Sequence, residues 1–98
     1  MTIPRVLVVD DEPQIRRSLR VALRANGYEV EEAATGAAAL EQAATRPPAL
    51  VILDLSLPDV DGVEVCRRLR EWTQLPVIIL SANGEDEAKV RALDEGAD

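Results

Sequence analysis

The sequence predicts an α/β fold in which helices cover both faces of a doubly wound parallel sheet, giving three layers, α/β/α. Three observations support this prediction. Short apolar runs rich in β-branched residues recur along the chain without alternating with polar residues, as strands buried on both faces do. Stretches with helical spacing of apolar residues separate these runs. Such alternation is typical of parallel strands joined by right-handed helical crossovers.

Four segments are predicted to be strands. Residues 6–9, 49–53 and 76–80 are short and apolar, so each is expected to be buried on both faces of the sheet. Residues 28–32 alternate apolar with acidic side chains, which is typical of an edge strand. No internal repeat and no linker interrupts the pattern, so residues 1–98 are expected to form one domain.

Four further segments are predicted to be helices: residues 13–26, 36–45, 62–72 and 85–95. Pro13 suits the first turn of the first helix, and Gly27 suits the position just past its end. The fourth helix opens with three acidic residues, which complement the helix dipole, and it ends before Gly96. Cys66 lies at helical spacing on the apolar face of the third helix, so we expect it in the core.

Composition excludes several classes of function. The chain has 98 residues, a net charge of −7, one cysteine and no histidine. These residues cannot supply a zinc site, an internal disulfide or a catalytic triad. The acidic balance argues against general binding of this segment to nucleic acid or anionic membranes. No apolar run approaches the length of a membrane span and the first residues lack a signal-peptide pattern, so we expect a cytoplasmic protein.

Polar side chains follow three of the buried strands at the point where each strand ends. Asp10 and Asp11 follow the first strand, Asp54 ends the third, and Ser81 follows the fourth. Ligands of open α/β sheets bind in the crevice at the carboxyl ends of the strands. We therefore expect the three carboxylates to share one rim of the sheet, with the Ser81 hydroxyl beside them.

Three carboxylates on one rim predict a cation site. Two carboxylates about 4 Å apart repel by roughly 4 kcal/mol at an effective dielectric of about 20, so a cation or a shared proton must offset them. Hard oxygen ligands suit Mg²⁺. Such a site aligns a phosphoryl group, and an aspartate within it can form an acyl phosphate. For "DDEP" alone a second interpretation stays open, in which Asp11 or Glu12 only caps the following helix.

Four motifs indicate a family. The segments "VLVVDDEPQIR", "LVILDLSLPDVDG", "LPVIILSA" and "VRALDEGAD" are spread along essentially the whole chain, from residue 6 to residue 98. In their order and spacing the sequence resembles the receiver domain of bacterial two-component response regulators. The stretch "ATRPPALVILDLSLPDVDGVEVCRRLREWTQLPVIILSA" is most similar to the OmpR/PhoB type and, within it, to the KdpE branch. The resemblance implies a flavodoxin/CheY-like sheet with strand order 2-1-3-4, followed in the family by a fifth strand and a fifth helix.

The resemblance implies a role for each residue of the rim. Asp54 would be the phosphoacceptor, Asp11 would bind Mg²⁺ directly, and Asp10 would hold the ion largely through water. Asp54 and the backbone carbonyl of Ser56 would complete the protein ligands. Ser81 would be the switch hydroxyl that moves toward the phosphoryl group.

The resemblance also implies features around the rim. Pro58 and Gly62 would shape the loop after the phosphoacceptor. Asn83 stands where this type usually has arginine, near the site entrance, and is expected to alter the rate of dephosphorylation. The family's lysine on the fifth strand would lie beyond Asp98, so the chain is interpreted as a C-terminally incomplete receiver domain.

A receiver domain implies partners. The phosphoryl donor would be a phosphohistidine on a sensor histidine kinase, and the switch would control transcription in a longer protein. The arginines of residues 13–26 are interpreted as a solvated basic face or, alternatively, as the surface that docks the kinase. A homodimer through the fourth-helix face is a further expectation.

The leading hypothesis is a phosphoacceptor switch that is not an enzyme, although it promotes its own phosphorylation and dephosphorylation. Two alternatives stay open. One is a truncated receiver that acts only as an interaction fragment. The other is a Mg²⁺-dependent phosphatase with an aspartyl-phosphate intermediate, although such enzymes usually have a second acid at the position of Ser56.

Overall fold

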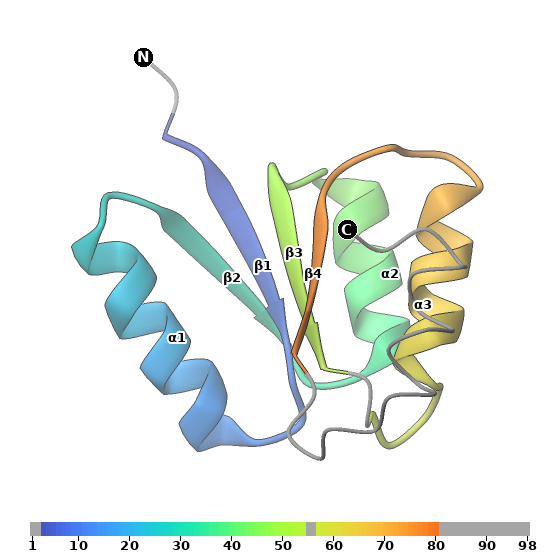
Figure 1. Ribbon diagram of the computed structural model, residues 1–98, viewed down its shortest axis with the longest axis horizontal. Helices are drawn as coiled ribbons and strands as arrows, with labels where there is room; N and C mark the ends of the chain where they lie inside the picture. The colour runs from blue at the N-terminus through green and yellow to red at the C-terminus, as the bar shows by residue number, and fades with distance from the viewer. Residues whose placement is uncertain (1–2, 55–56, 81–98) are drawn as a thin grey trace.

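The computed structural model describes residues 3–54 and 57–80. Figure 1 shows three layers, with α1 on one face of a sheet and α2 and α3 on the other. The strands are β1 (Arg5–Val9), β2 (Glu29–Ala33), β3 (Leu50–Asp54) and β4 (Val77–Leu80). The helices are α1 (Pro13–Ala25), α2 (Gly36–Thr45) and α3 (Gly62–Arg70). The predicted α/β/α class is therefore confirmed.

The sheet is parallel throughout, and its strand order is β2-β1-β3-β4, as the resemblance implied. β2 lies at an edge, in agreement with its alternating sequence. In the register of the two central strands, Val9 pairs with Leu53. The next residues along the chain, Asp10 and Asp54, are therefore placed at the same edge of the sheet.

Local signals set the ends of the helices. Pro13 occupies the first turn of α1, as predicted. After α1 the chain turns at Gly27, whose φ of 87° lies in the left-handed region that favours glycine. The side chain of Thr35 begins α2 by accepting a hydrogen bond from the backbone N–H of Ala38. Asp61 does the same for α3, accepting from the N–H of Val63.

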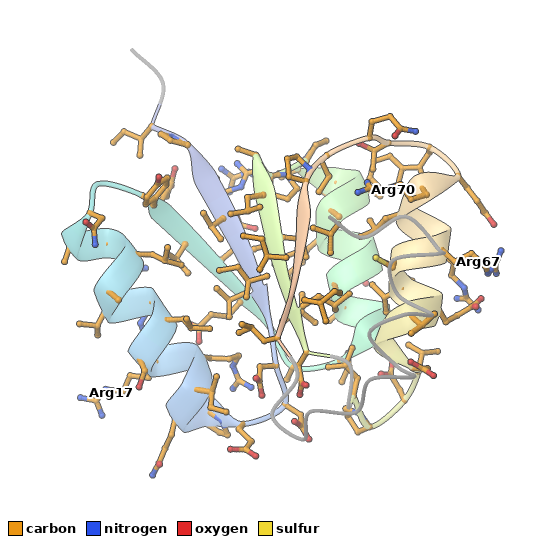
Figure 2. All side chains as sticks on the ribbon, viewed as in Figure 1. Arg17, Arg67 and Arg70 are labelled. Atoms are coloured by element: carbon orange, nitrogen blue, oxygen red, sulfur yellow. The ribbon has the colours of Figure 1, made fainter. Side chains whose placement is uncertain are left out.

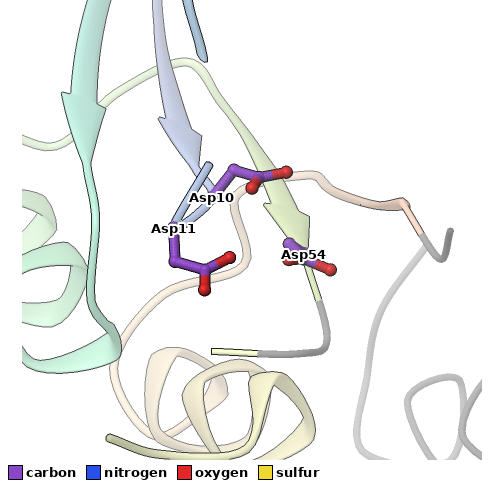
Figure 3. Close-up of side chains that lie close together, drawn as sticks. All are labelled: Asp10, Asp11 and Asp54. Carbon is purple, nitrogen blue, oxygen red and sulfur yellow. The ribbon is translucent and has the colours of Figure 1, made fainter. Parts of the chain in front are cut away.

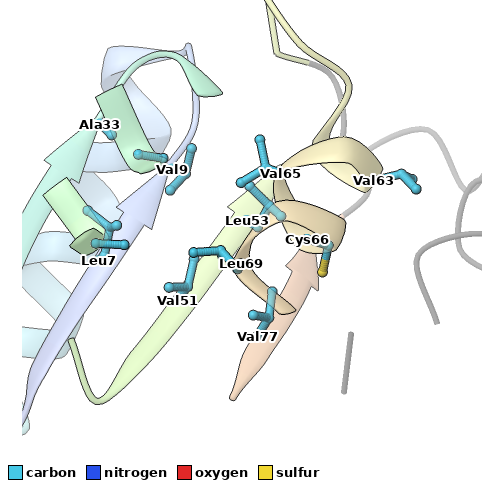
Figure 4. Packing of buried hydrophobic residues seen from close by; sticks show 12 residues of the cluster. Leu7, Val9, Ala33, Val51, Leu53, Val63, Val65, Cys66, Leu69 and Val77 are labelled. Carbon is cyan, nitrogen blue, oxygen red and sulfur yellow. The ribbon is translucent and has the colours of Figure 1, made fainter. Parts of the chain in front are cut away.

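Hydrophobic packing differs between the two faces of the sheet. On the face of α2 and α3, twelve of the residues that the structure describes form a buried core (Figure 4): Leu7, Val9, Ala33, Ala39, Ala43, Val51, Leu53, Val63, Val65, Cys66, Leu69 and Val77. The burial of Cys66 confirms its predicted place in the core. On the face of α1, four residues within 3–54 and 57–80 are buried: Val6, Val8, Val30 and Ile52. Leu19 and Leu23 of α1 pack against these four and stay partly exposed.

β4 departs from the prediction that it is buried on both faces. Val77 is fully buried, whereas Ile78 is 43% exposed and Leu80 is 37% exposed. Side chains alternate between the faces of a strand, so Ile78 and Leu80 point to the face opposite Val77. α1 lies on that opposite face but packs over β1 and β2, at the other end of the sheet. α1 therefore does not cover β4.

Candidate functional site

Three acidic side chains meet at the carboxyl ends of β1 and β3 (Figure 3). Asp10, Asp11 and Asp54 each place one carboxylate oxygen so that all three oxygens lie within 4.8 Å of one another. Asp10 is buried, Asp54 is half-buried and Asp11 is exposed, so the group extends from the core to the surface. The structure thus brings together the three acids that the sequence placed on one rim.

Asp10 is held at three points. Its backbone N–H donates to the carbonyl oxygen of Ala33 over 3.1 Å and so continues the pairing of β1 with β2. Its side-chain Oδ1 accepts a 2.9 Å hydrogen bond from the N–H of Glu12. Its backbone carbonyl accepts a 2.7 Å hydrogen bond from Nη1 of Arg16. The bond from Glu12 offsets part of the cost of burying the carboxylate of a residue that is only 4% exposed, and the other two satisfy its backbone.

Glu12 is the N-cap residue of α1, but its side chain makes no capping hydrogen bond. The interpretation of "DDEP" as a side-chain cap is therefore wrong for Glu12. Its backbone N–H instead donates to Asp10. The start of the helix thereby orients a carboxylate of the acidic group.

The loop that follows β3 is tied to α2. Asp59 accepts hydrogen bonds from the backbone N–H of Gly36 over 2.8 Å and of Ala37 over 2.9 Å, one on each carboxylate oxygen. The N–H groups of Ala37 and then Gly36 hold the pKa of Asp59 below its ordinary value of 3.8. Sequence reasoning missed this contact. Its only signal was a second aspartate in "LPDVDG", besides the Asp61 that caps α3.

Gly36 leaves the space that the contact between the Asp59 loop and the start of α2 requires. A Cβ atom at Gly36 would lie 2.1 Å from Cγ2 of Val60 and 2.9 Å from Cγ2 of Val65. The start of α2 thus approaches the loop and α3 more closely than any side chain allows. In this part of the chain Pro58 lies exposed in the loop, and Gly62 is the buried first residue of α3.

The arginines of α1 differ in their partners and in their exposure to solvent. Arg16 and Arg20 both pair with Glu32 of β2, at 3.4 Å and 2.6 Å. Arg17 extends away from the sheet (Figure 2) and is exposed. The interpretation of a wholly solvated basic face is therefore wrong for Arg16 and Arg20, because their ion pairs attach α1 to the sheet.

Several predicted features lie outside the described residues: Ser56, Ser81, Asn83 and the helix expected at residues 85–95. The roles assigned to them, and the expected cytoplasmic location, stay predictions. Within residues 3–54 and 57–80, no helix is long and apolar enough to cross a membrane.

Comparison with known proteins gives a consistent family. Residues 6–98 match the model of the response regulator receiver domain. The chain is similar to the transcriptional regulatory protein KdpE of Mycobacterium tuberculosis, with 57% identity over 93 residues. It is also similar to the KDP operon transcriptional regulatory protein KdpE of Escherichia coli, with 56% identity over 93 residues. In each comparison the match covers 95% of this chain and 41% of the relative, so the chain spans less than half of either protein.

Solved structures show the same fold. A CheY-like response regulator receiver domain protein from Methanospirillum hungatei superposes with a TM-score of 0.93 at 32% identity, over 99% of this chain and 78% of that one. The receiver domain of the Francisella response regulator 1452 gives a TM-score of 0.89 at 33% identity, over 97% of this chain and 79% of that one.

Proposed function

The chain belongs to the response regulator receiver family, and on that premise we propose that Asp54 accepts a phosphoryl group from the phosphohistidine of a sensor histidine kinase. The observation that carries the proposal is the grouping of Asp54 with Asp10 and Asp11, whose carboxylate oxygens lie within 4.8 Å. A cation would offset the repulsion between three acids this close, and it would also neutralise charge on a phosphoryl group during transfer. One bound cation would serve both needs.

Mg²⁺ fits the chemistry of these donors. The group supplies only carboxylate oxygens, the hard ligands that Mg²⁺ prefers. We propose that Asp11 and Asp54 bind the ion directly with the backbone carbonyl of Ser56, and that the buried Asp10 holds it largely through water. Bound there, Mg²⁺ neutralises charge on the phosphoryl oxygens.

In the proposed reaction a carboxylate oxygen of Asp54 attacks the phosphorus atom. The new bond is P–O, the phosphorus–nitrogen bond of the phosphohistidine breaks, and the imidazole leaves with the electron pair of that bond. Ser81 then donates a hydrogen bond to a phosphoryl oxygen, which is the proposed switch. Pro58 and Gly62 are proposed to shape the loop that connects Asp54, at the end of β3, to α3.

The chain is proposed to be a switch and not an enzyme. The relatives reported above are transcriptional regulatory proteins of more than twice its length, so control of transcription is proposed for a longer protein of this kind. A homodimer through the fourth-helix face belongs to the same proposal. Neither a phosphatase nor a separate interaction fragment gains support from these relatives or from the described residues.

The test is the intact mass of the chain after incubation with acetyl phosphate, with and without Mg²⁺. We expect one phosphoryl adduct that requires Mg²⁺ and is absent from Asp54→Asn. Glu29→Gln is the matched control, because it also removes one carboxylate but lies at the opposite end of β2 from the acidic group. An adduct of equal yield on Asp54→Asn would contradict the proposal.

A further inference from the structure

Arg16 of α1 contacts both the acidic group and the sheet. Its Nη1 donates to the backbone carbonyl of Asp10 over 2.7 Å, and its Nε lies 3.4 Å from Oε1 of Glu32. The side chain is 18% exposed. A guanidinium group is planar and presents several donors in fixed directions, so it can satisfy two acceptors without moving.

The second partner, Glu32, is itself held in place. It belongs to β2 and pairs in register with Val8, two residues before Asp10. Its other carboxylate oxygen, Oε2, accepts a 2.6 Å hydrogen bond from Nη1 of Arg20. Arg16 therefore connects the carbonyl of Asp10 to an anchor on the neighbouring strand.

Fixing the carbonyl of Asp10 has consequences for two carboxylates. The peptide unit between Asp10 and Asp11 is planar, so the direction of this carbonyl sets the plane of the whole unit. The N–H of Asp10 is fixed separately on the carbonyl of Ala33. With both ends of Asp10 held, the direction in which its side chain leaves the backbone is held as well. The peptide unit after Asp11 is held too, because the N–H of Glu12 donates to Oδ1 of Asp10, so the backbone is fixed on both sides of Asp11.

We infer that Arg16 is a positioning residue that sets the geometry of Asp10 and Asp11 for metal binding. The inference rests on the proposed function, since it concerns the affinity of the same acidic group for its cation. Residues that orient metal ligands from outside the ligand set typically change metal affinity by about ten- to a hundredfold when they are replaced.

The sign of the effect separates positioning from charge. Removing a positive charge beside three carboxylates makes the site more negative, which by Coulomb's law tightens the binding of a cation. Loss of positioning weakens binding instead. An arginine that acted only through its charge would therefore give the opposite result from the one inferred here.

Arg16→Met and Arg17→Met form the matched pair. Each removes one positive charge from α1 and keeps an unbranched stem that favours helix. Arg16 contacts Asp10 and Glu32, whereas Arg17 is exposed and extends away from the sheet. The dissociation constant of Mn²⁺, used as the probe ion, is measured by electron paramagnetic resonance on the whole chain and both variants. We expect Arg16→Met to weaken Mn²⁺ binding by about tenfold and Arg17→Met to leave it unchanged or tighter.

Arg16→Lys completes the test. Its single ammonium group can donate to the carbonyl of Asp10 but cannot also span to Glu32 in the same fork geometry, so we expect partial recovery of affinity. If Arg16→Met does not fold, the comparison of Arg16→Lys with Arg17→Lys decides, with weaker binding expected for Arg16→Lys alone. Equal affinities within either pair would overturn the inference. Absence of Mn²⁺ binding by the wild type would overturn the proposed function and this inference with it.

Discussion

The two faces of the sheet are closed by different forces. On the face of α2 and α3, apolar side chains are packed out of solvent, and α3 alone buries five of its residues. On the other face no residue of α1 is buried. α1 instead combines partly exposed leucines with two arginines that pair with Glu32. We call these the packed face and the charged face.

The acidic group lies where the two faces meet, and each face holds a different part of it. Asp54 ends β3, whose Leu53 is buried in the packed face. Asp10 is held by Arg16 and by the first turn of α1 on the charged face. Asp54 is therefore supported by apolar packing, whereas Asp10 depends on contacts with α1, a helix that is attached to the sheet partly by ion pairs that salt screens.

The largest expected effect contrasts a leucine from each face. Leu69→Ala in α3 removes a side chain that is 1% exposed, and we expect a loss of about 3 kcal/mol in the free energy of unfolding. Leu19→Ala in α1 removes a partly exposed side chain, and we expect a loss of about 1 kcal/mol. Both are leucines inside helices, so helix propensity cancels in the comparison. Urea unfolding measures both, and equal losses would contradict the distinction between the faces.

Gly36→Ala tests how closely the packed face is fitted. The added Cβ would lie 2.1 Å from Cγ2 of Val60, so backbone or side chains must shift. Overpacking of this kind costs about 1–3 kcal/mol, which exceeds the gain of about 1 kcal/mol that alanine brings to a helix. We therefore expect a net loss in urea unfolding. Ser18→Ala on the exposed side of α1 is the control, and a stabilising Gly36→Ala would contradict the close fit.

Much of the site followed from the sequence because it depends on backbone topology. A parallel sheet of order 2-1-3-4 places the residues after β1 and β3 at one edge, and so it brings Asp10 and Asp54 together. The contacts of Asp59 with α2 and of Arg16 with Asp10 did not follow. Each contact depends on where one side chain points, toward a segment far away in the sequence for Asp59 and from a helix back to the end of a strand for Arg16. The periodicity of apolar residues carries no information about such directions.

The exposed side of β4 is a second feature that the sequence did not predict. An apolar run predicts a buried strand, but burial depends on which neighbour covers each face. The position of α1 over β1 and β2 leaves Ile78 and Leu80 partly exposed. Composition of the strand alone contained no information about the placement of that helix.

The start of α2 is capped twice, locally by Thr35 and from the distant loop by Asp59, and the two caps are expected to respond differently to pH. Thr35→Ala removes the cap that α2 makes within its own segment, at an expected cost of about 1 kcal/mol that does not change with pH. Asp59→Asn removes a charged cap that comes from the loop. Because the pKa of Asp59 is lowered in the folded state, its contribution is present above the ordinary pKa of 3.8 and is lost as the pH falls through the folded pKa.

The measurement is the difference in free energy of unfolding between each variant and the wild type, at about pH 7 and about pH 3. For Asp59→Asn we expect this difference to shrink on acidification, and for Thr35→Ala we expect it to stay constant. A pH-independent effect of Asp59→Asn would show that the charge of this cap contributes nothing to the stability of the packed face.

The smallest expected effect belongs to the charged face. Arg20 and Glu32 are about one-third and one-quarter exposed, at 32% and 27%, and such pairs contribute about 0.2–1 kcal/mol. Arg20→Met should therefore cost about 0.5 kcal/mol at low salt, and the cost should become smaller near about 1 M NaCl, where the screening length is about 3 Å. Leu69→Ala, measured at the same salt concentrations, supplies the control, because burial of an apolar side chain is not screened. If the Arg20→Met loss persisted at high salt, α1 would be held by the packing of the arginine stem against the sheet, and the charged face would differ from the packed face only in degree.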